Sequence, residues 1–410
     1  MKLLQIIRSV NPTGGGVIET VKQFSRVLEA QGHGTTIASL DAPHDSWVLS
    51  CPHQVAALGP ARGTYGITRR FIPWLRQHAA EFDAAVVNGL WQFHSYATWR
   101  AMRGNGPPYF VFPHGMLDPW FRRAYPLKHL KKCLYWPWAE YRVLRDARAV
   151  LFTSEQEQRL ARGSFRLYRA TERIVPLGIA RPAGNAASER EIFHERFPEC
   201  RGKRLVLFLG RIHEKKGCDL LIRAFAEVAP FHSDLLLVLA GPEQQNASPW
   251  RALAAEAGIA HRVVWTGMLD GALKWGALRS AEVFALPSHQ ENFGIAVAEA
   301  LSCGVPVLIS REVNIWREVT ESGAGLAEAD TAEGATALLQ QWLEKTPEER
   351  AQMRMQAQAC FEQRFEIGQA TEALLRVIGG ERRHIPPPGR FVPALVPAHQ
   401  GVHSRWGGVR

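Results

Sequence analysis

The sequence predicts an α/β protein with two Rossmann-like domains, each a doubly wound parallel sheet, that face each other across a central cleft. Its 410 residues exceed the roughly 250 to 300 at which a single hydrophobic core stops growing. Short runs rich in Leu, Val and Ile alternate with longer amphipathic segments, which is typical of parallel strands covered by helices on both faces. This alternation weakens near residue 180 and restarts after about residue 203, so we expect two such units in tandem.

The first half supplies the elements of the first domain, residues 1–185. A helix is predicted over 17–31, and strands are predicted over 2–7, 35–40, 84–88, 109–112 and 149–153. Pro182, Gly184 and a polar run then predict a linker over 180–203.

The second half repeats the layout and forms the second domain, residues 200–360. Helices are predicted over 218–229, 250–257 and 294–303, and strands over 205–209, 235–240, 263–266, 283–286 and 305–309. A helical segment over 331–378 has no strand after it, and we expect its end, 361–380, to cross back to the first domain. The basic tail 381–410 contains three consecutive prolines and is predicted to be disordered.

Composition excludes several classes of protein. No run of about 18 apolar residues could span a bilayer, and the apolar N-terminus lacks a small-residue cleavage site, so it is interpreted as a first strand. We therefore expect a cytoplasmic protein. The six cysteines are scattered singly, and no HExxH, P-loop or Asp-x-Asp pair is present, so we predict a metal-free mechanism without a cofactor.

The clearest chemical pattern is 286–310, LPSHQENFGIAVAEALSCGVPVLIS. A polar loop contains Glu291, and a helix is expected to begin near Phe293 and Gly294 at the ligand edge of the sheet. Unpaired N–H groups at a helix N-terminus bind anions such as a diphosphate. Glu299, further along the helix, could accept hydrogen bonds from sugar hydroxyls. The alternative is that both glutamates are ordinary surface carboxylates.

A second anion-binding pattern follows the first strand of the second domain, where 209–217 reads LGRIHEKKG. Arg211 can grip phosphate oxygens with two hydrogen bonds, and Lys216 lies close in sequence, as neutralising a diphosphate requires. His213 and Glu214 are interpreted as solvent-facing spacers.

With these elements the chain resembles the retaining glycosyltransferases of family 4, which have the GT-B fold. The pairs Gly210-Arg211 and Lys216-Gly217 are followed by Glu291 and Glu299 with seven residues between them, and the resemblance spans about residues 2–378. It implies that Arg211 and Lys216 hold the donor diphosphate, that Glu299 binds the ribose, and that Glu291 orients the donor sugar. The first domain would bind the acceptor and the second the sugar nucleotide.

The resemblance implies further donor contacts. The backbone of Asn292, Phe293 and Gly294 would contact the phosphates or the sugar, and Gly241 and Gly267 would frame the base. Residues 11–16, NPTGGG, would form a glycine loop that brings Gly15 and Gly16 near the donor phosphate, unless the loop is a simple turn.

Three residues of the first domain complete the predicted site. His114, at the end of a strand, would hydrogen-bond the donor sugar by resemblance, although a lone histidine is more often structural. Asn88 and Trp91, which follow another strand, would line the acceptor pocket.

These residues predict a metal-independent, retaining hexosyltransferase. It would move a sugar from a nucleotide-diphosphate sugar to a glycan or lipid-linked acceptor, as in bacterial surface polysaccharide biosynthesis. The alternative enzyme is a sugar-nucleotide 2-epimerase of the same fold. The net charge of +10 would also be compatible with a nucleic-acid-binding protein. No nucleic-acid motif accompanies this charge, so we expect no nucleic-acid partner.

The segment Trp120 to Tyr141 mixes aromatic residues with Lys and Arg. Such a surface suits anionic lipid headgroups, and we expect that it places the protein on the inner face of the plasma membrane. The alternative is a partly buried helical pair with solvated cations.

Overall fold

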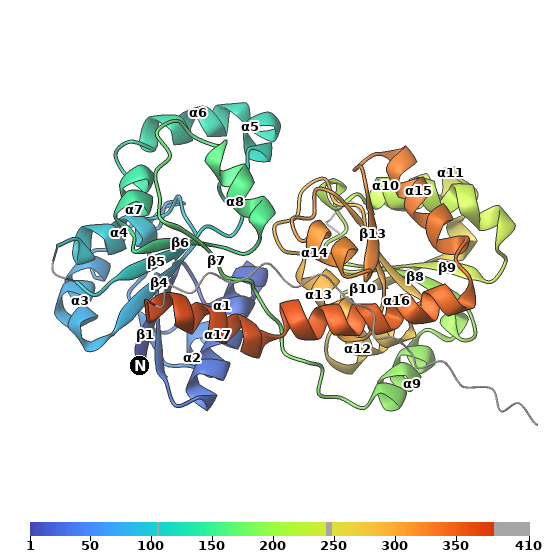
Figure 1. Cartoon of the computed structure of the whole chain (residues 1–410), viewed down its shortest axis with the longest axis horizontal. Coiled ribbons are helices and arrows are strands. Elements are labelled where there is room, and N and C mark those ends of the chain that lie inside the picture. The colour runs from blue at the N-terminus through green and yellow to red at the C-terminus, as the bar shows by residue number, and fades with distance from the viewer. Residues whose placement is uncertain (105, 243–247, 381–410) are drawn as a thin grey trace, which may run out of the picture.

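The computed structural model describes residues 1–104, 106–242 and 248–380, and it contains two α/β domains side by side (Figure 1). The first domain contains a seven-stranded sheet and the second a six-stranded sheet. All neighbouring strands in both sheets are parallel, with helices on both faces. The predicted fold class is confirmed.

The first sheet has the strand order β3-β2-β1-β4-β5-β6-β7. Its strands are β1 (Lys2–Ile7), β2 (Gly34–Ser39), β3 (Val55–Ala57), β4 (Ala84–Asn88), β5 (Tyr109–Phe112), β6 (Ala149–Phe152) and β7 (Glu172–Ile174). The helices of this domain are α1 (Gly16–Ala30), α2 (Ser46–Leu49), α3 (Phe71–His78), α4 (Phe93–Met102), α5 (Trp120–Ala124), α6 (Pro126–Tyr135), α7 (Glu140–Asp146) and α8 (Glu155–Arg162).

The second sheet has the order β10-β9-β8-β11-β12-β13. Its strands are β8 (Arg204–Leu209), β9 (Leu235–Ala240), β10 (Val263–Gly267), β11 (Val283–Leu286), β12 (Val307–Ser310) and β13 (Gly325–Glu328). The helices after β7 are α9 (Ala186–Arg196), α10 (Cys218–Val228), α11 (Ser248–Glu256), α12 (Gly271–Ser280), α13 (Ile295–Ser302), α14 (Trp316–Glu321), α15 (Ala332–Leu343), α16 (Pro347–Cys360) and α17 (Ile367–Ile378).

Strand order reverses beside the first strand of each domain. In the first sheet β1 lies between β2 and β4, and in the second β8 lies between β9 and β11. A doubly wound sheet opens a crevice at such a switch point, outside the carboxyl ends of its strands. The loops after β1, β4, β8 and β11 are therefore where a ligand is expected.

The three strands that the sequence did not predict are short and lie at sheet edges. They are β3, β7 and β13, and most of their residues are only partly buried. An edge strand needs no continuous apolar run because one side faces solvent or loops.

The predicted linker over 180–203 is wrong in its middle, because α9 occupies Ala186–Arg196 there. Asn185 caps the helix by accepting from the backbone N–H groups of Ala187 and Ser188. The helix packs against α12, where a side chain at Gly276 would collide with the carbonyl oxygen of Glu189. Helix α9 could not be recognised in the sequence because it is mostly polar, and its fully buried apolar residue is Phe193.

The helical segment after β13 forms α15, α16, a short π-helical stretch and α17, and no strand follows among the described residues. Figure 1 shows α16 and α17 running along one side of the molecule, with α17 beside α1 of the first domain. Ile179 donates to the Phe365 carbonyl and accepts from the Ile367 N–H, which fixes this return. The predicted disordered tail lies outside the described residues.

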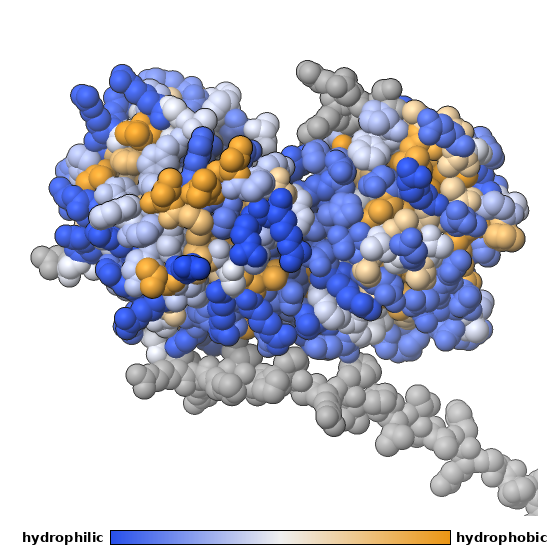
Figure 2. All heavy atoms as spheres, turned by 90° about the horizontal axis from the view of Figure 1, so that it is seen from above, coloured by the Kyte–Doolittle hydropathy of each residue, from blue (hydrophilic) through white to orange (hydrophobic). Residues whose placement is uncertain are grey.

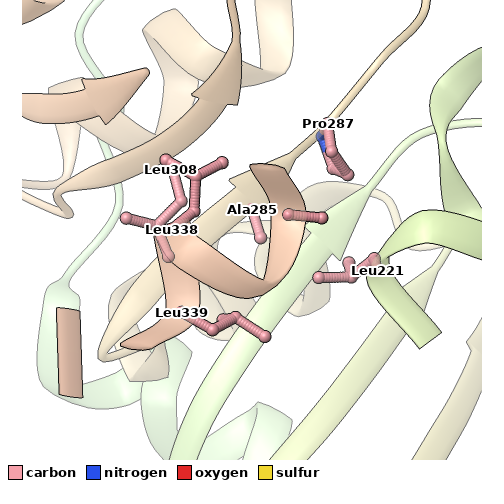
Figure 3. Close-up of a pocket in the computed structure, with 7 residues that line it drawn as sticks. Leu221, Ala285, Pro287, Leu308, Leu338 and Leu339 are labelled. Carbon is pink, nitrogen blue, oxygen red and sulfur yellow. The ribbon is translucent and has the colours of Figure 1, made fainter. Parts of the chain in front are cut away.

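The second domain contains a small pocket (Figure 3). Its lining is entirely apolar and comes from α10, β11, β12, α15 and the residue after β11: Leu221, Ala285, Pro287, Leu308, Ala335, Leu338 and Leu339. It offers no side chain that could orient a polar ligand. Among the described residues, no helix combines the length and apolarity that crossing a bilayer requires.

Candidate functional site

The two domains meet where the loops after β5 and β6 face the loop after β11. Gln290 donates to Asp118 (3.0 Å), and Asn292 donates to the hydroxyl of Thr153 (3.3 Å). A Cβ at Gly16, the first residue of α1, would lie 2.8 Å from Cδ1 of Ile295, the first residue of α13. The glycine loop of one domain thus approaches the start of a helix in the other, and a side chain at Gly16 would require the Ile295 side chain to shift.

Lys216 and Glu291 form the central charge pair of this region. Lys216 ends the 3-10 turn Glu214–Lys216 after β8, and its ammonium contacts the Glu291 carboxylate in the loop after β11. Both side chains are mostly buried, at 18% and 19% exposure. The structure therefore brings together two of the predicted catalytic residues from two neighbouring strands.

Two more cations lie beside this pair. Burial, together with Lys215 and Arg211, lowers the pKa of Lys216 to about 8, whereas the touching Glu291 carboxylate favours its charged form. Arg211 is solvent-exposed. Lys215 reaches into the first domain, with its ammonium 5.2 Å from the ring centre of Trp120 and 5.6 Å from that of Phe121. The cluster suits an anion with more than one negative charge.

The predicted spacer role of His213 is wrong. Its Nδ1 accepts a hydrogen bond from the Lys215 N–H (3.0 Å), so its side chain caps the turn that carries both lysines. Glu214 is exposed, as expected.

The loop after β11 is held in shape before it enters α13. Gly294 has φ 75°, in the left-handed region that favours glycine, and it is the N-cap of α13. The helix begins at Ile295, one residue after the predicted start. The side chain of Phe293 is buried edge-on against Phe365, so its backbone is the part left for a ligand.

Glu299 lies on α13 and has a cationic partner that could not be predicted from the sequence. Its carboxylate is 2.8 Å from the ammonium of Lys274 on α12, and Lys274 also lies over the Trp275 ring. Nothing in the sequence around Lys274 distinguishes it from a solvated lysine of an amphipathic helix.

The two glycines expected to frame the base differ in environment. A side chain at Gly241 would collide with the carbonyl oxygen of Gly210, and its N–H donates to the Gly267 carbonyl (2.8 Å). Close packing between the turns after β8 and β9 therefore explains why residue 241 is a glycine. A Cβ at Gly267 would meet no atom within 4 Å, so Gly267 borders open space. Gly15, the N-cap of α1, also has open space around it.

His114 and Asn88 are joined in the first domain. His114 follows β5 with φ 50°, an uncommon conformation for a non-glycine residue, and its Nε2 is 3.0 Å from Oδ1 of Asn88. Burial lowers the pKa of His114 to about 4, so the imidazole is neutral at physiological pH. The Asn88 amide also donates to Gln5 (3.0 Å), and the side chain is buried. Asn88 is thus placed to position His114 rather than to face an open pocket.

Trp91 is partly buried and is held by several contacts. It has φ 67°, its N–H donates to the buried carboxyl of Glu140 (2.7 Å), and its indole N–H donates to the Met116 carbonyl (3.1 Å). Its ring packs against Trp136 and Phe165. Burial raises the pKa of Glu140 to about 7.

A buried glutamate that sequence reasoning missed supports the domain contact. Glu157, on α8, accepts from the N–H of Gly115 (2.6 Å) and from both the N–H and the hydroxyl of Thr153 (2.7 and 2.8 Å). It thereby ties the turn after His114 to the hydroxyl that Asn292 reaches from the other domain. In the sequence it is one of four consecutive acidic or amide residues in a helical run and carries no distinguishing signal.

Within the described residues, no group of three or more His, Cys, Asp or Glu is arranged to hold a metal ion. The site as described consists of cations, hydrogen-bonding side chains and backbone N–H groups, which is a set suited to a phosphorylated polar ligand.

Comparison with known proteins identifies related families. Residues 189–359 match the family described as Glycosyl transferases group 1, and residues 15–178 match the Glycosyl transferase 4-like domain. Similar proteins include D-inositol 3-phosphate glycosyltransferase of Acidothermus cellulolyticus, 31% identical over 166 residues. That match covers 38% of this chain and 36% of the relative, so it spans about a third of the relative's length.

A longer match is to a GDP-mannose-dependent alpha-(1-6)-phosphatidylinositol dimannoside mannosyltransferase of Mycobacterium tuberculosis. It is 26% identical over 344 residues, covering 79% of this chain and 83% of that protein.

Solved structures share the fold over nearly the whole chain. Sucrose-phosphate synthase from Thermosynechococcus elongatus has a TM-score of 0.72 at 18% identity, with 92% of this chain and 98% of that chain covered. Anabaena HepE, solved in complex with UDP and glucose, has a TM-score of 0.73 at 17% identity, covering 93% of this chain and 100% of that chain.

Proposed function

We propose that this chain, which belongs to the group 1 glycosyltransferases, transfers a hexosyl group from a nucleotide-diphosphate sugar to a glycan or lipid-linked acceptor. The observation that carries the proposal is the contact between Lys216 and Glu291. In the proposed reaction Lys216 would hold the diphosphate and Glu291 would orient the sugar, and these two groups lie at the two ends of the bond to be broken.

The donor side of the proposal rests on the second domain. Lys216 lies where the turn after β8 meets the loop before α13, and Arg211 and Lys215 are close enough to lower its pKa. Cations and helix N–H groups lower the energy of the charge that develops on a leaving diphosphate. Glu299, with Lys274 beside it, would bind the ribose. The relative named as GDP-mannose-dependent and the neighbour solved with UDP and glucose support a sugar nucleotide as donor.

The transfer step needs no nucleophile from the protein. In the proposed reaction the bond from the anomeric carbon to the diphosphate oxygen breaks while a bond to the acceptor oxygen forms on the same face, with retention of configuration. The leaving phosphate oxygen takes the acceptor hydroxyl proton. His114, neutral and held by Asn88, would hydrogen-bond the donor sugar, and Trp91 would border the acceptor.

Acceptor and pathway are the more specific part of the proposal. Relatives named for inositol phosphate and phosphatidylinositol dimannoside, and a neighbour described as a glycosyltransferase involved in lipopolysaccharide biosynthesis, support a glycan or lipid-linked acceptor in surface polysaccharide synthesis.

The first test is a thermal-shift screen of UDP-, GDP-, ADP- and dTDP-sugars, measured with and without EDTA. A donor that binds the folded protein raises its unfolding temperature. The matching donor should stabilise the wild type but not Lys216→Ala, and EDTA should leave the shift unchanged if the reaction is metal-independent.

The second test separates transfer from epimerisation. A transferase releases nucleoside diphosphate when an acceptor is added, whereas a 2-epimerase interconverts sugar nucleotides without an acceptor. Epimerised sugar nucleotide formed in the absence of acceptor would overturn the proposed function.

A further inference from the structure

Helix α6, Pro126–Tyr135, has its apolar side chains in solvent rather than in the core. None of its residues is buried. Leu127, Leu130 and Leu134 are 77%, 59% and 71% exposed, and Trp138, in the turn after the helix, is 70% exposed. Residues three and four apart lie on one face of a helix, so the leucines form a single stripe. A stripe of this kind normally packs against a core, and here it faces outward.

Exposed positive charge borders the leucine stripe. Arg122, Arg123, Lys128 and Lys131 are all exposed. In the described part of the chain, none of the four has a carboxylate oxygen within 4.0 Å. Figure 2 views the α5–α6 side of the molecule and shows a line of apolar side chains on the first domain next to hydrophilic surface. Apolar and cationic groups therefore occupy the same face.

We propose that the leucine stripe of α6 docks onto an anionic lipid bilayer. The helix would lie in the interface with Leu127, Leu130 and Leu134 among the acyl chains, while the lysines and arginines contact the headgroups. This combination of a polar basic face and an apolar face is the physical requirement for an interfacial helix. The four exposed cations, which form no salt bridge in the described part of the chain, favour an anionic surface over an uncharged protein partner, because each gains energy near such a surface.

The opposite face of α6 connects this surface to the candidate site. The ammonium of Lys132 lies 4.5 Å from the ring centre of Trp91, and the Tyr135 hydroxyl contacts that of Tyr65. A helix with its side chains is about 10 to 12 Å across, so Trp91 would lie about one helix diameter from the bilayer. This consequence rests on the proposed function: a lipid-linked acceptor could keep its lipid in the bilayer while its glycan reaches Trp91.

Vesicle sedimentation with the full chain tests the docking. The vesicles are pure phosphatidylcholine, or phosphatidylcholine with about one third phosphatidylglycerol. The wild type should bind the anionic vesicles and not the neutral ones. Leu130→Ser combined with Leu134→Ser should lower the partition coefficient at least about tenfold. Lys128→Gln combined with Lys131→Gln should lower the partition coefficient about fivefold per charge removed. Added salt should also lower the partition coefficient.

A matched control removes exposed apolar side chains elsewhere. Leu49 is 73% exposed and Phe231 is 82% exposed, and Leu49→Ser with Phe231→Ser should bind vesicles like the wild type. Circular dichroism and thermal unfolding establish that each variant is folded. Transfer to a water-soluble acceptor should be unchanged in the leucine double variant, which separates loss of docking from loss of the proposed activity.

Several results would overturn the docking. One is a wild type that ignores anionic vesicles, and another is binding that the leucine double variant retains or that the control variant loses equally. The stripe would instead be an interface between two copies of this chain under two conditions. The wild type would not bind vesicles, and light scattering would show a dimer of the wild type that is absent in the leucine double variant.

Discussion

The Lys216 ammonium contacts the Glu291 carboxylate although 75 residues separate them in the chain. One follows β8 and the other follows β11, which are neighbouring strands of the sheet. An ammonium that is mostly buried and crowded by other cations is held there by this carboxylate. A diphosphate would supply a second anionic partner at the same point.

We therefore expect Lys216→Ala to lower kcat for sugar transfer by about 100- to 1,000-fold, the cost typical of removing one group that stabilises developing negative charge. Glu291→Ala should also reduce kcat, because it removes the carboxylate that orients the sugar. Since the two groups touch, the double variant should lose less than the product of the single losses. Steady-state kinetics of the four proteins measure this coupling.

Lys203 provides the control for Lys216. It is exposed and lies just before β8, at the opposite end of the strand from the site. Lys203→Ala should keep wild-type kcat. Turnover within a few-fold of wild type in Lys216→Ala would remove the proposed role of this lysine.

A second prediction concerns His114 and Asn88, whose side chains are 3.0 Å apart. If Asn88 acts by positioning the imidazole, His114→Ala and Asn88→Ala should each lower kcat/KM for the donor by about 3- to 10-fold, the worth of one neutral hydrogen bond. Asn88→Ala should then have little further effect in a His114→Ala background.

The binding of free nucleoside diphosphate gives the second readout for this pair. Calorimetry should find it unchanged in both variants, because the expected contact is with the sugar. If the effects of the two substitutions multiply fully, Asn88 has a role apart from His114, such as a direct contact with the acceptor.

Sequence reasoning succeeded where a strand is buried on both faces. Strand β9, Leu235–Ala240, is entirely buried and was predicted with its observed bounds. It failed for the edge strand β7, Glu172–Ile174, whose polar residues match no strand pattern. It also missed α9, which buries Phe193 and otherwise presents polar residues.

The candidate site divides in a similar way. Lys216 and Glu291 could be placed together from sequence, because each follows a strand and the ends of parallel strands share one edge of a sheet. Lys274 and Glu157 could not, since each lies within a helix, where only the packing of that helix decides which group it meets.

A third prediction concerns Glu157, which accepts three hydrogen bonds through both carboxylate oxygens. Glu157→Gln replaces one oxygen with an NH₂ group that faces an N–H donor. We expect the free energy of unfolding to fall by roughly 1 to 3 kcal/mol, the cost of leaving a buried polar group unsatisfied. We also expect lower kcat, because the turn of His114 loosens.

Glu155→Gln is the matched control on the same helix. Glu155 is exposed and pairs with Arg159 at 3.3 Å, so its loss should cost well under 1 kcal/mol. Chemical denaturation measures the stabilities. Equal stability of Glu157→Gln and Glu155→Gln would show that Glu157 does not hold this contact together.

A final prediction concerns the pH dependence of stability. Burial raises the pKa of Glu140 to about 7 in the folded protein, from an ordinary value of 4.5. Between these two pH values the folded state keeps a proton that the unfolded state releases, so the free energy of unfolding falls as the pH rises. The loss should reach about 3 kcal/mol above pH 7, at about 1.4 kcal/mol for each unit of pKa difference.

Glu140→Gln removes the titration while preserving the shape of the side chain. The wild type should therefore lose unfolding temperature relative to Glu140→Gln between pH 5 and pH 8, as measured by thermal unfolding of both proteins. Glu344→Gln, at an exposed position, should follow the wild type at both pH values. If the unfolding temperatures of wild type and Glu140→Gln differed by a constant amount across this range, the Glu140 carboxyl would be ionised throughout. We expect otherwise, because the carboxyl is fully buried and one of its oxygens lacks a hydrogen-bond partner.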